Sequence, residues 1–356
     1  MTDFRKELAE TAAKLATPGK GILAADESTG TIGKKFSSIG VDNTEDNRRA
    51  YRELLFTTEH LENYISGVIL YSETAKQSAK CGTKFIEVLK KKGIVSGIKV
   101  DQGLKVLPGT NDETATMGLD SLDAMAKEYY ALGCRFAKWR AVLKISTADG
   151  CPSEQAIQEN AWGLARYGTI CQANGLVPII EPEILIDGPH SIEVSQKVTE
   201  RVLASVVKAL QENNIFWEGC LLKPNMVTPG STSGVKATAS EIAIRTVTAL
   251  SRTIPPALVG VFFLSGGQSE EEASVNLNAM NRLEGIRRPW FLSFSYGRAL
   301  QNTAVKTWAG KHENVAAAQA ALLVRAKANG EAQLGKYQGT DDQSAKESLF
   351  VDNYKY

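Results

Sequence analysis

The chain has 356 residues, of which 43% are hydrophobic and 23% are charged, and these values are ordinary for a globular protein and outside the range of disordered chains. Its 41 basic and 40 acidic side chains give a formal net charge of +1, which excludes a global field for binding nucleic acid or an anionic membrane. Any anion site must therefore be local.

The first twenty residues predict a helix and carry the acidic side chains Asp3, Glu7 and Glu10, without the apolar stretch of a signal peptide. The longest apolar runs, such as Ala257 to Leu264, are far shorter than the roughly 18 residues of a membrane span. The five cysteines are widely spaced and form no CxxC pair. We expect a cytosolic protein with reduced thiols.

Short apolar runs recur along the chain at the spacing of βα units, and amphipathic stretches of helical period separate them. The expected strands are Gly21 to Ala25, Ile65 to Tyr71, Val95 to Val100, Cys134 to Trp139, Leu176 to Ile180, Phe216 to Leu222, Ala257 to Leu264, and Trp290 to Phe294. Because the runs are apolar throughout, they are typical of parallel strands covered on both faces. We predict a single α/β domain, a parallel (β/α)8 TIM barrel over residues 1–330, with an open doubly wound sheet as the alternative.

Helical periodicity also predicts individual helices between the strands, several of which open with a Ser or Asp cap. The examples are Glu53 to Asn63, Leu122 to Leu132, Glu154 to Asn174, Ser191 to Asn213, and Ser240 to Thr253. A relaxed dinucleotide pattern at Gly19, Gly21 and Ala24 precedes its strand instead of following it, which excludes a nicotinamide site. Residues 331–356 are rich in Gly, Gln and Asp and predict a mobile tail.

Polar residues close almost every expected strand, and in a (β/α)8 barrel these strand ends form the active face. The closing residues are Asp26, Glu27 and Ser28; Lys99 and Asp101; Lys138 and Arg140; Glu181 and Glu183; Lys223 and Asn225; Ser265, Gly266 and Gly267; and Ser295, Gly297 and Arg298. Residues two apart on a strand share a side, so Lys138 with Arg140 and Glu181 with Glu183 converge on one cavity. The alternative is a structural ion-pair network at the rim.

Lysine is the nucleophile that this pattern offers, because a desolvated amine can attack a carbonyl. Lys99, Lys138 and Lys223 all qualify, and the spacing does not choose among them. Lys138 and Lys223 belong to even-numbered strands, which contribute to the same interior layer of a barrel. The two lysines therefore lie close together if the strand registers match.

Phosphate is the anion that the loops suggest. The loops after the last two strands, with a helix N-terminus, are the recurring phosphate cradle of this architecture. A second anion site can form from Ser28, Thr31, Lys34 and Lys35, with Lys99 nearby, and two sites imply a bisphosphate.

A metal site is not expected. The histidines His60, His190 and His312 lack ligand spacing, and we interpret them as surface residues. Ser269 with Glu272 reads as a capping box, so the following glutamates indicate a helix start and receive no catalytic role.

Taken together, the strand-end motifs resemble those of the class I fructose-bisphosphate aldolases, a metal-free Schiff-base family, over nearly the whole chain. The motifs occur in family order: GILAADES around Asp26, GIKVD at Lys99, FAKWR at Lys138, EPEI at Glu181, LLKPNM at Lys223, LSGGQS at Ser265, and FSYGRAL at Ser295. The resemblance implies Lys223 as the Schiff-base lysine, Lys138 as its helper, Glu181 as general acid and base, Asp26 as base at the 4-hydroxyl, and Glu183 as the partner that positions the lysines.

The same resemblance implies the substrate contacts. Ser265, Gly266, Gly297 and Arg298 match the 1-phosphate site, Ser28, Thr31, Lys35 and Lys99 match the 6-phosphate site, and Arg140 and Ser295 are further substrate contacts. The family commonly has Ser at the position of Thr31 and Arg at that of Lys35, and lysine lacks the bidentate fork of arginine. Tyr356 matches the family's C-terminal tyrosine, which implies that the tail reaches the active site.

The implied function is the reversible cleavage of fructose 1,6-bisphosphate to dihydroxyacetone phosphate and glyceraldehyde 3-phosphate in glycolysis and gluconeogenesis, without a cofactor. The resemblance also implies a homotetramer and a scaffold role with filamentous actin or acidic peptides. Another Schiff-base barrel enzyme, such as a transaldolase, is the nearest alternative, and it would need one phosphate site where this sequence offers two.

Overall fold

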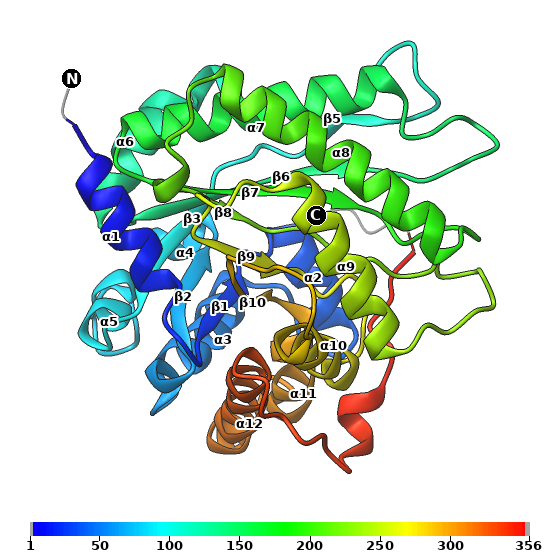
Figure 1. Cartoon of the computed structure of the whole chain (residues 1–356). Helices are drawn as coiled ribbons and strands as arrows, with labels where there is room; N and C mark the ends of the chain where they lie inside the picture. The colour runs from blue at the N-terminus through cyan, green and yellow to red at the C-terminus, as the bar shows by residue number, and fades with distance from the viewer. Residues whose placement is uncertain (1–2, 353–356) are drawn as a thin grey trace.

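The computed structural model describes residues 3–352, and within them eight parallel strands close into a barrel (Figure 1). Around the barrel the order is β1, β10, β9, β8, β7, β6, β3 and β2, so the closed sheet replaces the doubly wound alternative. The strands are β1 Gly21–Ala25, β2 Ile65–Leu70, β3 Val95–Lys99, β6 Phe136–Leu143, β7 Val177–Ile184, β8 Leu221–Leu222, β9 Gly260–Phe263 and β10 Phe291–Tyr296.

Helices surround the barrel, and several match the sequence prediction to within about two residues. They are α1 Arg5–Leu15, α2 Thr29–Ser37, α3 Glu45–Thr57, α4 Ser72–Lys76, α5 Phe85–Lys91, α6 Leu122–Leu132, α7 Glu154–Ala173, α8 Ile192–Glu212, α9 Ala239–Thr253, α10 Glu270–Arg282, α11 Arg298–Trp308 and α12 Val315–Gln333. Short 3-10 turns are η1 Leu61–Asn63, η2 Leu119–Ser121, η3 Trp217–Gly219, η4 His312–Asn314 and η5 Gln343–Lys346.

The helix expected at Glu53 to Asn63 is wrong. Helix α3 begins eight positions earlier, because Thr44 is its N-cap and accepts a hydrogen bond from the Asn47 amide at 3.2 Å. It ends at Thr57, and the chain then passes through His60 in the left-handed region. The true start signal was the cap, which the apolar periodicity did not reveal.

Strands β6 and β7 extend further than predicted, because the charged residues at their ends are buried inside the sheet. In register, Arg140 lies opposite Glu181 and Val142 opposite Glu183. The apolar runs stop before these residues, although the strands continue through them. Strand β8 is in turn shorter than its apolar run, which begins as the turn η3.

The N-terminal end of the barrel interior is filled with apolar side chains. The cluster includes Ile22, Ala24, Ile69, Val95, Phe136, Val177, Ile179, Leu221 and Phe262. Helix α1 adds Leu8, Ala12 and Leu15 to it and closes that end of the barrel, at the left of Figure 1. The opposite end is left for polar side chains.

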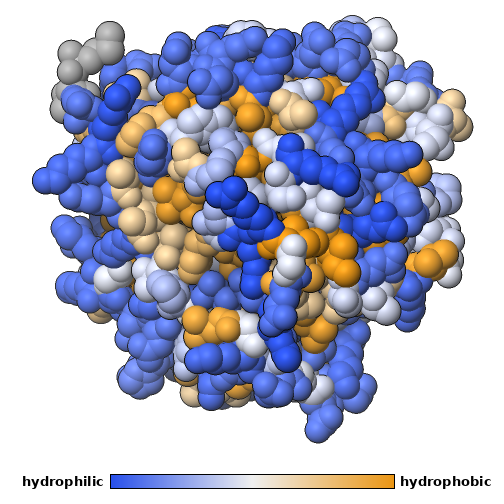
Figure 2. Space-filling view, viewed as in Figure 1, coloured by the Kyte–Doolittle hydropathy of each residue, from blue (hydrophilic) through white to orange (hydrophobic). Residues whose placement is uncertain are grey.

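An antiparallel hairpin, β4 Leu104–Val106 with β5 Thr114–Thr116, follows β3 and was not predicted. The face of the molecule seen in Figure 2 is mostly polar, with apolar side chains in separate patches. No helix among residues 3–352 is both long and apolar enough to cross a membrane.

The chain beyond α12 returns along the outside of the barrel. Helix α12 runs to Gln333, past the expected boundary at residue 330. Turn η5 contacts α10, and the Arg298 guanidinium donates to the Leu349 carbonyl at 2.5 Å (red in Figure 1). The described part of the tail therefore packs on the barrel, and its mobility stays a prediction.

Close packing inside the barrel depends on Gly97, which lies opposite Phe136 in register. A Cβ atom at Gly97 would lie 2.2 Å from the Phe136 ring. We expect Gly97→Ala to lower the free energy of unfolding by about 1–3 kcal/mol, because the ring must move within a packed interior. Urea unfolding measures this.

The matched control is Gly163→Ala in α7, where a Cβ would meet open space. There the substitution should stabilise the protein by about 0.5–1 kcal/mol through helix propensity. Equal stability of the two variants would contradict the packing argument.

Candidate active site

Four charged side chains meet inside the C-terminal half of the barrel. Each of them is at most 2% exposed: Asp26, Lys138, Glu181 and Lys223. Lys138 and Glu181 lie within β6 and β7, whereas Asp26 and Lys223 directly follow β1 and β8. Burying this many charges is tolerated only when they compensate one another.

Glu181 lies between the two lysines. Its Oε2 is 3.2 Å from the Lys138 ammonium, and its Oε1 is 3.5 Å from the Lys223 ammonium. Lys138 also contacts Asp26 Oδ2 at 3.1 Å. The predicted proximity of Lys138 and Lys223 is therefore present, and a shared carboxylate joins them.

Strand register explains why these groups meet. Lys138 lies opposite Lys99 on β3 and opposite Ile179 on β7, and the Lys223 amide donates to the Ile180 carbonyl at 2.7 Å. Glu181 follows Ile180, so its side chain projects to the level between the two lysines.

The ionisation of the cluster is unusual. Burial lowers the pKa of Lys223, and the neighbouring Lys138 ammonium lowers it further, against the pull of Glu181. Burial alone would raise the pKa of Asp26, but Lys138 and Lys223 outweigh it and hold that pKa below its ordinary value. A lowered pKa makes the unprotonated amine of Lys223 easier to reach, and amine addition to a carbonyl requires that form.

A second pair lies one step further along β6 and β7. The Arg140 guanidinium donates to Glu183. Burial opposes ionisation of Glu183, but Arg140 and then Arg298 outweigh it, so the pKa of Glu183 lies below its ordinary value. Among residues 3–352 the ion pair of Glu183 is with Arg140 and with no lysine, so the role of positioning the lysines stays a prediction.

The residues expected for the 1-phosphate gather around a small cavity. Its lining includes Glu181, Glu183, Lys223, Ser265, Gly266, Ser295, Gly297 and Arg298. Gly297 is the N-cap of α11 and Arg298 its first residue, so the positive end of the helix dipole faces the cavity. Gly266 has a φ of +50°, a backbone conformation that residues with a side chain rarely adopt. This geometry suits an anion beside the lysines.

Of the other expected phosphate residues, Ser28 and Thr31 lie at the start of α2, Lys35 in its last turn, and Lys99 at the end of β3. Ser28 caps the helix, and its hydroxyl is 3.0 Å from that of Thr31. The Lys35 ammonium contacts Glu27 at 2.5 Å, and Lys99 contacts Asp101 at 2.7 Å. Both lysines thus have carboxylate partners here, and their contact with phosphate stays a prediction.

Sequence reasoning missed the residue that holds Lys35. Glu27 also pairs with Arg52 of α3 at 2.8 Å, and both side chains are buried. Burial opposes ionisation of Glu27, but Lys35 and Arg52 lower its pKa to about 2. The Asp-Glu-Ser run at the end of β1 was a sequence signal for Glu27. The sequence pattern did not indicate that Arg52 of α3 is its partner.

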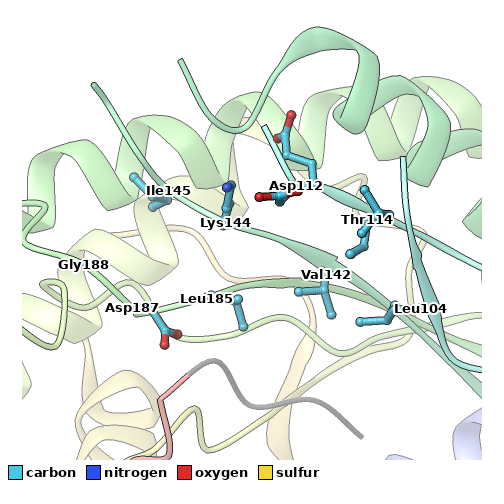
Figure 3. A pocket seen from close by; sticks show the side chains of 11 residues that line it. Leu104, Asp112, Thr114, Val142, Lys144, Ile145, Leu185, Asp187 and Gly188 are labelled. Carbon is cyan, nitrogen blue, oxygen red and sulfur yellow. The ribbon is translucent and has the colours of Figure 1, made fainter. Parts of the chain in front are cut away.

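A cleft of about 590 Å³ lies beside the barrel mouth, between the β4–β5 hairpin and the ends of β6 and β7 (Figure 3). Leu104, Val142 and Leu185 form part of its wall, together with Asp112 and Lys144. None of the four buried charged residues Asp26, Lys138, Glu181 and Lys223 lines this cleft, so its large volume does not identify it as the site of the reaction.

Three further expectations concern residues away from the cluster. His190 is 7% exposed, so its assignment to the surface is wrong, and burial lowers its pKa. Among residues 3–352 no group of three or more His, Cys, Asp or Glu side chains is arranged to hold a metal ion. Tyr356 lies outside the described residues.

Comparison with known proteins agrees with this geometry. A family model described as fructose-bisphosphate aldolase class-I matches residues 7–356. The chain is 61% identical over 352 residues to fructose-bisphosphate aldolase 4, cytosolic, of Arabidopsis thaliana, covering 98% of this chain and 89% of that protein. It is 60% identical over 355 residues to fructose-bisphosphate aldolase 1 of Toxoplasma gondii, covering 99% and 97%.

A solved structure is similarly close. The fructose-bisphosphate aldolase of Plasmodium falciparum, crystallised with TRAP and a small-molecule inhibitor, superposes with a TM-score of 0.94. Its identity to this chain is 57%, and the match covers 96% of this chain and 97% of the other.

The Glu27 pair generates a prediction about pH. A carboxylate whose pKa falls from 4.5 to about 2 on folding contributes stability above pH 4.5, and this contribution is lost as the pH falls through 2. Glu27→Gln should therefore destabilise the protein by about 3–5 kcal/mol at neutral pH, because Lys35 and Arg52 lose a buried partner. The difference in free energy of unfolding between the parent protein and Glu27→Gln should narrow as the pH falls from 4.5 to 2, and urea unfolding measures it.

The control is Glu10→Gln, since Glu10 forms an exposed ion pair with Lys6 at 3.9 Å. That change should alter stability by less than about 1 kcal/mol. If Glu27→Gln lowers the free energy of unfolding by the same amount from pH 4.5 to pH 2, the charge of the Glu27 carboxylate does not contribute to stability.

Proposed function

The chain belongs to the class I fructose-bisphosphate aldolase family, carbon–carbon lyases of glycolysis, and we propose that Lys223 carries its reaction as a Schiff base. The reaction is the reversible cleavage of fructose 1,6-bisphosphate to dihydroxyacetone phosphate and glyceraldehyde 3-phosphate. The observation that supports Lys223 is its burial within 3.5 Å of Glu181, where burial and the Lys138 ammonium lower its pKa against the pull of Glu181. A transaldolase-like activity finds no support in these relatives.

Imine formation needs an unprotonated amine and a group that moves protons. The lowered pKa of Lys223 supplies the amine, and the Glu181 carboxylate lies within 3.5 Å of its nitrogen. Glu181 also touches Lys138, so a proton can pass between the two lysines through one carboxylate. We therefore assign Glu181 as general acid and base and Lys138 as its partner in the carbinolamine steps.

Cleavage of the C3–C4 bond needs a base at the 4-hydroxyl. Asp26 contacts Lys138, and its lowered pKa keeps it ionised, so it can accept that proton. The protonated imine at Lys223 takes up the electron pair of the breaking bond, and glyceraldehyde 3-phosphate leaves. The enamine that remains is protonated at C3, which we assign to Tyr356, and water then releases dihydroxyacetone phosphate with the help of Glu181.

Two phosphate sites hold the substrate in this proposal. The 1-phosphate binds Ser265, Gly266, Gly297 and Arg298, where a helix N-terminus and a guanidinium meet. The 6-phosphate binds Ser28 and Thr31 at the start of α2, Lys35 in the last turn of that helix, and Lys99 at the end of β3. Arg140 and Ser295 complete the substrate contacts. Lys35 must exchange part of its contact with Glu27 for the phosphate.

Assembly and other partners are further proposals. We propose a homotetramer, as the family resemblance implies, and a scaffold role toward filamentous actin or acidic peptides. The Plasmodium falciparum aldolase was crystallised with TRAP, which supports protein binding by this fold. Relatives named cytosolic or cytoplasmic agree with the cytosolic location expected from the sequence.

The Schiff-base assignment predicts that Lys223→Met lowers turnover of fructose 1,6-bisphosphate by roughly 10³-fold or more, since a thioether cannot form an imine. Methionine has a similar volume, so the fold should persist. Lys144→Met, in the cleft outside the cluster, is the control and should retain activity. A Lys223→Met enzyme with substantial turnover, at intact circular dichroism, would rule out the assignment.

A further inference from the structure

Several polar side chains near the two proposed phosphate sites complete helix caps. The predicted capping box of α10 is present: the Ser269 amide donates to Glu272 at 2.9 Å, and the Glu272 amide donates to the Ser269 hydroxyl at 3.0 Å. Ser28 caps α2, where its hydroxyl accepts from the Thr31 amide at 3.3 Å. Gln301 lies inside α11 and is fully buried, so its polar side chain needs another explanation.

The side chain of Gln301 joins three other elements to α11. Its Nε2 donates to the Ala24 carbonyl of β1 at 2.7 Å. Its Oε1 accepts from the Tyr51 hydroxyl of α3 at 2.9 Å and from the Lys35 ammonium of α2 at 3.2 Å. A carbonyl can only accept and an ammonium can only donate, so these two partners fix which way the amide points. Gln301 therefore presents an oxygen atom to Lys35.

The backbone of Gln301 belongs to the other phosphate site. Its amide donates to the Gly297 carbonyl at 3.1 Å and closes the first turn of α11, which begins at Arg298. A Cβ atom at Gly297 would lie 3.3 Å from the Ala24 carbonyl oxygen, so this turn packs closely on β1. One residue thus contacts Lys35 of the proposed 6-phosphate site and belongs to the helical turn of the proposed 1-phosphate site.

Lys35 has two partners of different kinds. The Glu27 carboxylate, 2.5 Å from the ammonium, neutralises it, so a phosphate must compete with that carboxylate for the same charge. The amide oxygen of Gln301 has no net charge, so it holds the ammonium in place without neutralising it. Lysine is a point charge on a flexible stem. When phosphate takes over part of the Glu27 contact, the ammonium keeps its position because a second partner holds it.

We propose that Gln301 is a positioning residue for Lys35 and sets the preference for a bisphosphate over a 1-monophosphate. It keeps the Lys35 ammonium at the 6-phosphate, and it fixes the separation of that ammonium from the first turn of α11. A ketose with a single phosphate at C1 uses only the α11 end and gains nothing from this hold. This inference rests on the 6-phosphate contact proposed for Lys35, and it adds the residue that prepares that contact.

The test compares steady-state kinetics on fructose 1,6-bisphosphate and on fructose 1-phosphate with the full-length enzyme. Gln301→Met removes the oxygen that holds Lys35 but keeps an unbranched side chain and the backbone bond to Gly297. Tyr51→Phe is the matched control, because it removes a hydrogen bond to the same oxygen and leaves the Lys35 contact in place. Gln301→Glu is a second variant, which keeps the shape of the side chain in case methionine does not pack. Circular dichroism checks the fold of each.

We expect Gln301→Met to raise the KM for the bisphosphate by roughly threefold to tenfold, with the KM for fructose 1-phosphate and both kcat values within about twofold of the parent. Gln301→Glu should raise the same KM at least as much, because its carboxylate neutralises Lys35. Tyr51→Phe should leave the ratio of the two KM values unchanged. In a Lys35→Met background, Gln301→Met should change that ratio no further, because both substitutions act on one contact.

The inference and the proposed function fail in different ways. If Lys35→Met raises the KM for the bisphosphate selectively but neither Gln301 variant does, the positioning role is overturned and the 6-phosphate contact of Lys35 stands. Equal rises for both substrates in the Gln301 variants, or the same selective rise in Tyr51→Phe, also overturn it, because general packing would then explain the effect. If Lys35→Met changes both KM values equally, or changes neither, the 6-phosphate contact fails and the positioning role fails with it.

Discussion

Two lysine ammonium groups buried in one barrel are the constraint on which the site depends. Charges removed from water are costly unless opposite charges compensate them, and Lys138 and Lys223 share the Glu181 carboxylate between them. Asp26 supplies the second anion. Burial and the Lys138 ammonium lower the pKa of Lys223 against the opposing pull of Glu181, and the two lysines together lower the pKa of Asp26. Removing the Glu181 carboxylate would take away the partner that both lysines share.

The two ends of the barrel interior contain different kinds of side chain. Helix α1 and the apolar cluster around Phe136 fill the N-terminal end, which fixes the registers of β3, β6 and β7. Those registers bring Lys138 and Glu181 to one level at the other end. Helices α10 and α11, which follow the two loops of the proposed 1-phosphate site, are joined by hydrogen bonds from Thr303 to Glu270.

Much of this could be read from the sequence, because parallel strands impose a simple rule on side chains. Lys138 and Arg140, two residues apart, point to one side, and the polar strand ends marked the cluster correctly. What could not be read depends on contacts between distant elements. Glu27 pairs with Arg52 of α3 as well as with Lys35, and α3 was misplaced because its start signal, Thr44, lies outside the apolar pattern. The predicted strands β6 and β7 were too short, because a charged residue indicates the end of a strand when its buried partner is unknown.

The central claim is that Lys223, and not one of its neighbours, forms the covalent bond to substrate. Borohydride reduction of the enzyme in the presence of dihydroxyacetone phosphate makes that bond permanent, and peptide mapping then locates it. We expect one modified peptide per chain, with the added mass on Lys223, and none when the phosphate ester is omitted. Modification of Lys99 or Lys138 in its place, or no modification at all in an active preparation, would contradict the account.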